Sequence, residues 1–106
     1  MEKKPHYKVI VSDRARQMLA GHVRFLAQES PKAARRTKNE LIDAIRSLSS
    51  MPERFPFLNV EFIPVNKYHK MFVEKWYLIL YQIKDQTGYV DYIVDCRQDY
   101  GWLIRS

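Results

Sequence analysis

The residues best suited to chemistry stand at the end of the last β-rich run, where the chain reads Arg97-Gln98-Asp99-Tyr100. A strand that delivers an arginine, an aspartate and a tyrosine side by side indicates a surface for a charged partner, such as a phosphate. We therefore take Arg97, Asp99 and Tyr100 as candidate residues of a site for such a partner.

Two further candidates lie in an earlier β-rich run. His69 and Lys70 are close enough, in a sheet of three consecutive strands, to supply a proton shuttle and a phosphate clamp. Because adjacent residues of a strand point to opposite faces, only one of them can join Arg97. Lys70 shares its face with Tyr68 and Phe72, which could stack on nucleic-acid bases. The alternative for these aromatics is ordinary core packing.

The sequence predicts neither a metal site nor a bound cofactor. Glu53, Glu61, His69 and Cys96 do not show the spacing of metal ligands, and no glycine-rich phosphate loop is present. The single Cys96 cannot form an internal disulfide, which fits a reducing cytoplasm. We interpret it as a small buried hydrophobic residue.

Charge is unevenly distributed along the 106 residues, whose formal net charge is +6. Residues 1–50 hold eleven Lys/Arg and five Asp/Glu, whereas residues 51–106 hold seven of each. A basic first half indicates an acidic partner, either nucleic acid or protein, or else a solubilising surface. The length predicts one domain over 1–106. No apolar run approaches the roughly 18 residues that span a bilayer, and no secretory signal is evident, so we expect a cytoplasmic protein.

The first half reads as a strand followed by a helical hairpin. Tyr7–Ser12 is β-rich, and Ser12 is typical of a helix N-cap. The apolar residues of the first helix recur with helical spacing, and His22 within them is interpreted as a packed side chain. Ser30 and Pro31 predict the start of a second helix. Its expected buried face is Ala34, Thr37, Leu41, Ala44, Ile45 and Leu48, and its opposite, partner-binding face is a basic stripe of Lys32, Arg35, Arg36 and Arg46.

The second half predicts an antiparallel sheet. Residues 52–66 contain three prolines and are expected to form an ordered loop, with a short edge strand over Val60–Ile63. Strands are expected over Tyr68–Val73, over Trp76–Ile83 and through residues 89–97. The strand over Trp76–Ile83 has apolar residues on both of its faces, so it must lie in the centre of the sheet. In the last strand Val90, Tyr92, Val94 and Cys96 should share one face. One sheet face should pack on the helices and the other should become polar towards the strand end, in an α+β fold.

This order of elements, with its local sequences, resembles the RelE/ParE superfamily of toxins from type II toxin–antitoxin systems. The resemblance covers about residues 7–103. It rests on six segments in the right order, which are Tyr7–Ser12, Ser30–Arg36, Leu48–Pro56, Tyr68–Met71, Tyr77–Tyr81 and Cys96–Tyr100. It implies an N-terminal strand, a two-helix hairpin and a three-stranded meander packed on the helices. It also implies a small toxin held in a hetero-oligomer by a cognate antitoxin with an acidic tail.

The resemblance leaves three functions open. RelE-like members cut messenger RNA on the ribosome without metal, ParE-like members inhibit DNA gyrase, and some members have no demonstrated activity. The nucleases carry an arginine on the central strand where this chain has Leu78. Losing one such charge donor typically costs about 3 kcal/mol of transition-state stabilisation. Arg97 and Tyr100 match one nuclease subgroup, but Asp99 replaces its histidine, and Arg97-Gln98-Asp99 is similar to the Arg-Arg-Asp ending of ParE-like members.

These comparisons favour a toxin that binds its target, with a metal-free, ribosome-dependent endoribonuclease as the first alternative. The nuclease would use Arg97, Tyr100 and either His69 or Lys70. The second alternative is an inactive member whose sole partner is its antitoxin. In all three cases an acidic antitoxin segment should lie along the helical hairpin, with apolar anchors beside the basic stripe.

Overall fold

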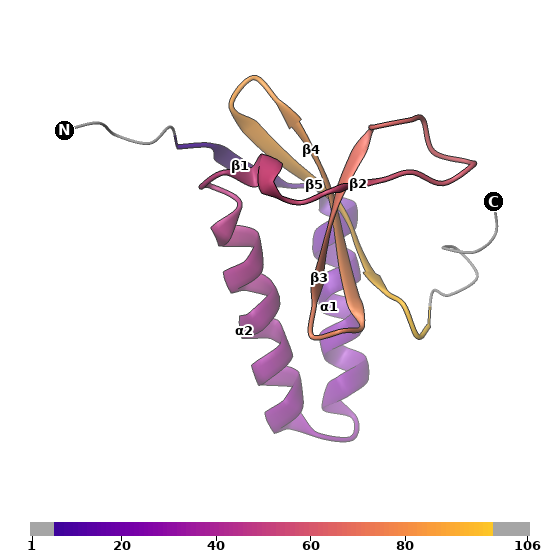
Figure 1. Cartoon of the computed structure of the whole chain (residues 1–106). Helices are drawn as coiled ribbons and strands as arrows, with labels where there is room; N and C mark the ends of the chain where they lie inside the picture. The colour runs from indigo at the N-terminus through magenta and orange to yellow at the C-terminus, as the bar shows by residue number, and fades with distance from the viewer. Residues whose placement is uncertain (1–5, 99–106) are drawn as a thin grey trace.

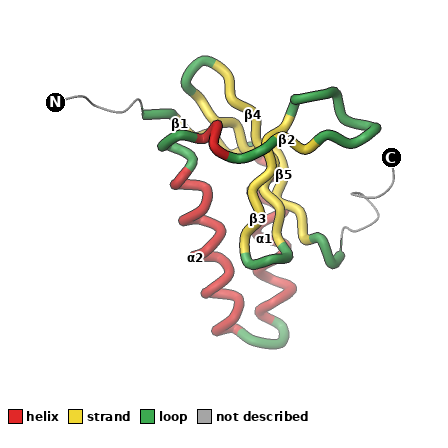
Figure 2. The backbone as a smooth tube through the Cα atoms, in the orientation of Figure 1, coloured by secondary structure: helices red, strands yellow, loops and turns green. Residues whose placement is uncertain are grey.

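Two helices cover one face of a five-stranded sheet in the computed structural model, which describes residues 6–98 (Figure 1). The sheet has the order β1-β5-β4-β3-β2, with β1 parallel to β5 and the other pairs antiparallel. Figure 2 shows the two helices side by side as a hairpin. The elements are β1 (Lys8–Val11), α1 (Asp13–Ala27), α2 (Pro31–Ser47), the 3-10 helix η1 (Pro52–Arg54), β2 (Phe57–Leu58), β3 (Tyr68–Val73), β4 (Tyr77–Lys84) and β5 (Thr87–Asp95). The predicted α+β architecture is confirmed.

Both helices begin at the predicted caps. The Ser12 hydroxyl accepts a hydrogen bond from the Ala15 amide at 3.0 Å, and Ser30 does the same for Ala33 at 3.1 Å. Each cap satisfies one of the amides that a helix start leaves without an intrahelical partner. His22 is packed as expected, since its Nε2–H donates to the Ile93 carbonyl at 2.7 Å and thereby ties α1 to β5.

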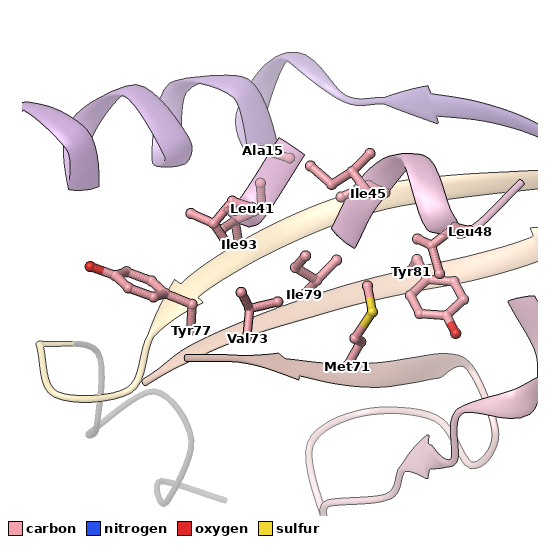
Figure 3. Close-up of a cluster of buried hydrophobic side chains, with 11 residues drawn as sticks. Ala15, Leu41, Ile45, Leu48, Met71, Val73, Tyr77, Ile79, Tyr81 and Ile93 are labelled. Atoms are coloured by element: carbon pink, nitrogen blue, oxygen red, sulfur yellow. The ribbon is translucent and has the colours of Figure 1, made fainter. Parts of the chain in front are cut away.

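The core lies between the helical hairpin and the sheet (Figure 3). The strand β4 is its centre, because Tyr77 through Tyr81 are all buried although their side chains alternate between the two faces. The predicted central strand is therefore confirmed. The helix-facing cluster is made of Ala15, Leu41, Ile45, Leu48, Met71, Val73, Tyr77, Ile79, Tyr81, Val90 and Ile93. A second cluster on the other face consists of Leu58, Tyr68, Leu78, Leu80 and Val94.

The expected edge strand over Val60–Ile63 is wrong. These residues form a turn, in which the Ile63 amide donates to the Val60 carbonyl at 3.1 Å. The short edge strand is β2, which lies earlier and pairs Phe57 with His69 and Leu58 with Tyr68. Leu58 is thereby buried in the second cluster, and this burial favours pairing of β3 with Phe57–Leu58 over pairing with Val60–Ile63.

The expectation that Val90, Tyr92, Val94 and Cys96 share one face of the sheet is also wrong. A β-bulge interrupts the pairing of β4 with β5, so that Tyr81 pairs with Val90 and Leu80 with Tyr92, while Asp91 is the extra residue. The Asp91 carboxylate accepts hydrogen bonds from Tyr68 and Gln82, both at 2.9 Å, which fixes the bulge. Val90 consequently lies in the helix-facing cluster, whereas Val94 lies in the cluster on the opposite face. Both faces of the sheet are apolar.

The cap at Ser12 gives a direct test of this fold. Ser12→Ala removes the bond to the Ala15 amide and a second bond to the Asp91 carbonyl. We expect a loss of about 1 kcal/mol in the free energy of unfolding, measured by urea denaturation. Ser50→Ala, at an exposed serine that caps neither helix, should change that free energy far less. Equal effects of the two substitutions would contradict the capping role.

Candidate functional site

Arg97 is held at the end of β5 by neighbours within its own chain. Its Nε lies 3.3 Å from Oδ1 of Asp95, and its Nη2 lies 3.3 Å from the Tyr77 hydroxyl. The guanidinium also sits over the Trp76 ring, with its central carbon 5.0 Å from the ring centroid. Asp95 is 2% exposed, so the carboxylate that holds Arg97 is itself buried. The arginine expected to meet a phosphate is thus already paired with an internal anion.

The electrostatics of this cluster follow from that pairing. Burial by itself would lower the pKa of Arg97, but the hydrogen bond and the charge of Asp95 outweigh burial and raise it. Burial, together with the charge of Asp95, raises the pKa of Tyr77. Both raised pKa values keep Arg97 cationic and the Tyr77 phenol neutral at neutral pH. Such a cluster is suited to holding the strand end in place.

His69 lies in a different part of the sheet. Its Nδ1–H donates to the Phe55 carbonyl at 2.6 Å, and its ring lies between those of Phe57 and Tyr81, with centroid distances of 4.1 and 5.2 Å. The carbonyl can only accept, which fixes the proton on Nδ1. This histidine connects the residues before β2 with the central strand.

The pairing register separates His69 from Arg97. On β4, Tyr81 pairs with His69 and Tyr77 pairs with Asp95, so the two sites are four residues apart. At about 3.4 Å per residue this separation is about 14 Å along the strand. Lys70 pairs with Leu80 and points to the face away from the helices. The structure thus does not bring either residue to Arg97, and Asp99 and Tyr100 lie outside the described residues.

The central-strand position that carries an arginine in the nucleases is closed to solvent. Leu78 is 1% exposed and belongs to the cluster on the face away from the helices. A charged side chain at this position would have to be desolvated without a partner. The replacement by leucine is therefore part of the packing of the sheet.

The basic stripe lies on the exposed side of α2, as its spacing predicts. Lys32, Arg35, Arg36 and Arg46 are all exposed. Arg36 is engaged, since its Nε lies 3.5 Å from the carboxylate of Glu74 in the β3–β4 connection. Thr37 donates to the same carboxylate at 2.9 Å. Within residues 6–98, the other three cations of the stripe form no ion pair and are available to an acidic partner.

The structure also shows a groove that sequence reasoning missed. It is an open hollow of about 290 Å³ between the two helices, and we call it the hairpin groove. Its apolar floor is flanked by three cations, and the lining residues are Arg16, Leu19, Ala20, Val23, Arg24 and Lys38. One signal was available, because Arg16, Ala20 and Arg24 recur every four residues and therefore form one ridge of α1.

The described part of the chain contains neither a cluster of metal-ligating side chains nor a helix suited to a membrane. Over residues 6–98, no group of three or more His, Cys, Asp and Glu side chains is arranged to hold a metal ion. Over the same range, neither helix is long and apolar enough to cross a membrane.

The element order and the basic hairpin are those expected of the RelE/ParE superfamily of toxins. Residues 9–100 match the family model described as the ParE toxin of the type II toxin–antitoxin system parDE, and the chain belongs to this family. Its structure is similar to a solved one titled "Chromosomal ParDE TA system from P. aeruginosa", with a TM-score of 0.70 and 12% sequence identity. That match covers 87% of this chain and 98% of the other. Comparison with curated proteins gives no match.

The tyrosine beside His69 gives a prediction about pH. Burial raises the pKa of Tyr81 to about 12. Between pH 10 and 12 the unfolded chain loses this proton while the folded protein keeps it, so stability is full below pH 10 and falls above it. The expected slope is about 1.4 kcal/mol per pH unit for this residue.

The measurement is urea denaturation of the wild type and Tyr81→Phe across this pH range. The variant should be less stable at neutral pH, because it lacks the hydrogen bond from the Tyr81 hydroxyl to the Pro52 carbonyl. Its stability should then fall less steeply than that of the wild type above pH 10. If the stability of both proteins fell equally steeply above pH 10, the raised pKa of Tyr81 would be contradicted.

Proposed function

We propose that this chain is a growth-inhibiting toxin that acts by binding a cellular protein, with DNA gyrase as the first target to test, and that a cognate antitoxin neutralises it. Membership in the ParE family supports both the toxin and the antitoxin partner. The observation that carries the choice of binding over catalysis is the buried Leu78 on the central strand, where the nucleases have an arginine. A gyrase-directed toxin would act in the cytoplasm.

The geometry around Arg97 supports the same choice. Metal-free RNA cleavage needs a base, a cation for the phosphorane charge and an acid, all within hydrogen-bond reach of one substrate. Here Asp95 neutralises Arg97, and His69 lies about 14 Å away along the strand. A misplacement of even 1 Å can slow a reaction by about a hundredfold. Among the described residues no observation favours the endoribonuclease alternative.

The antitoxin is proposed to lie along the helical hairpin. Lys38 and Arg35 are three residues apart and adjacent on the surface of α2, so the hairpin groove borders the basic stripe. An acidic, amphipathic segment could place apolar side chains against Leu19 and Val23 while its carboxylates meet the flanking cations. The apolar anchors would supply most of the specificity, because desolvated ion pairs contribute little net free energy.

The proposed mode of action is tested by inducing the toxin in cells and assaying purified protein in parallel. We expect growth arrest, inhibition of gyrase supercoiling and no new transcript ends. New cleavage sites in messenger RNA would contradict the proposal in favour of the nuclease. Unchanged growth at full expression would instead indicate an inactive member of the family.

The antitoxin surface is tested by charge reversal at the hairpin groove. Arg24→Glu combined with Lys38→Glu should weaken binding of the adjacent antitoxin at least tenfold, measured by calorimetry, because both cations flank the apolar floor. Lys84→Glu, at an exposed lysine at the end of β4, is the charge-matched control for each of the two single reversals. A control that weakens binding equally would indicate a general effect of net charge.

A further inference from the structure

We propose that this toxin binds the acidic protein it inhibits through the tip of the β3–β4 hairpin, with Phe72 and Trp76 as the aromatic anchors. The inference rests on the proposed function, because it assigns the target-binding site of that same activity. We call Lys70, Phe72, Glu74, Lys75 and Trp76 the hairpin tip. No residue of the tip lines the hairpin groove.

Two large aromatic side chains stand exposed on either side of one turn. Phe72 is 57% exposed and Trp76 is 46% exposed. Phe72 lies near the end of β3, where it pairs with Leu78, and Trp76 is the last residue of the turn that joins β3 to β4, so both aromatics lie at the same end of this hairpin. Single exposed apolar residues are ordinary, but a neighbouring pair indicates a contact surface. Tryptophan is also among the residues enriched at the centres of protein interfaces.

The turn between the aromatics has a strained backbone. Glu74 and Lys75 have φ angles of 52° and 70°, in the left-handed region that favours glycine. Such conformations cost of order 1 kcal/mol or more each and persist where the surrounding structure enforces them. The restraints are visible here, because Arg36 and Thr37 hold the Glu74 carboxylate and the Cys96 amide donates to the Trp76 carbonyl at 2.7 Å. These contacts therefore hold the backbone of the tip in its conformation without a bound partner.

The charges of the tip select an acidic partner. Its carboxylate, Glu74, is bound by Arg36 and Thr37, and the nearby Asp95 is bound to Arg97. Lys70 and Lys75 form no ion pair within the described part of the chain, so the excess charge is positive. Complementary charge accelerates encounter and selects against wrong partners.

The environment of Trp76 favours a protein over single-stranded nucleic acid. The Arg97 guanidinium occupies one face of the indole ring, 5.0 Å from the ring centroid. A base that stacked on this face would have to displace the arginine from its bonds to Asp95 and Tyr77. Two lysines also provide few phosphate contacts for a strand. An acidic protein surface can instead use the exposed ring edges together with the lysine ammonium groups.

The test compares Phe72→Ala and Trp76→Ala, alone and combined, with Phe25→Ala. Phe25 is the matched control, because it is 49% exposed on α1 and belongs to neither the tip nor the hairpin groove. Growth arrest in cells is the first measurement, and gyrase inhibition by purified protein is the second. We expect the double variant to need at least a tenfold higher concentration for half-inhibition, and the control to behave as wild type.

Binding of the antitoxin verifies that each variant is folded, and Trp76→Phe should keep most of the activity because it keeps an aromatic anchor. If the double variant arrests growth as well as wild type, the inference is overturned while the proposed function stands. If the wild type arrests growth without inhibiting gyrase, that target is wrong, and the loss in the double variant still supports the tip. If the wild type instead binds single-stranded RNA through the tip with a steep salt dependence, the choice of a protein partner is overturned.

Discussion

The burial of β4 on both faces is the constraint on which the rest of the molecule depends. From Tyr77 to Tyr81 each side chain lies in an apolar cluster, alternately beneath the helices and on the opposite side. A charge in the middle of this strand would lose its hydration without gaining a partner. Charged side chains are therefore excluded from Tyr77 to Tyr81 of β4, and the carboxylates of β5 lie at its bulge and at its end, where each has hydrogen-bond partners.

This exclusion explains why the candidate catalytic residues do not meet. His69 lies where β3 enters the sheet, and Arg97 lies where β5 leaves it. Each is tied to its own surroundings, the histidine by the Phe55 carbonyl and the arginine by Asp95. A protein built in this way is better suited to present fixed surfaces than to assemble an acid, a base and a cation around one phosphate.

Local rules made much of the fold predictable from the sequence. Ser12 and Ser30 could be recognised because an N-cap depends on its own residue and on amides close by, and β4 could be recognised from its unbroken apolar run. The separation of His69 from Arg97 was also within reach, since counting outward from the turn after Val73 gives the register.

Other features depend on contacts between distant segments and could not be predicted. The bulge at Asp91 is fixed by Tyr68 and Gln82, which lie on other strands. The position of β2 is decided by the burial of Leu58 against the far face of the sheet. The hairpin groove requires the packing of two helices, although the ridge of Arg16, Ala20 and Arg24 that borders it is visible in the sequence.

Glu74 connects the two surfaces that the molecule offers. Its carboxylate binds Arg36 of the basic stripe and Thr37 of α2, and its backbone forms part of the strained turn beside Trp76. An antitoxin carboxylate that reached Arg36 would compete with Glu74 for a surface ion pair worth at most about 1 kcal/mol. The bond from Thr37 would remain, because that side chain is buried beneath the stripe. The antitoxin could therefore recruit Arg36 at little cost while the turn kept its shape.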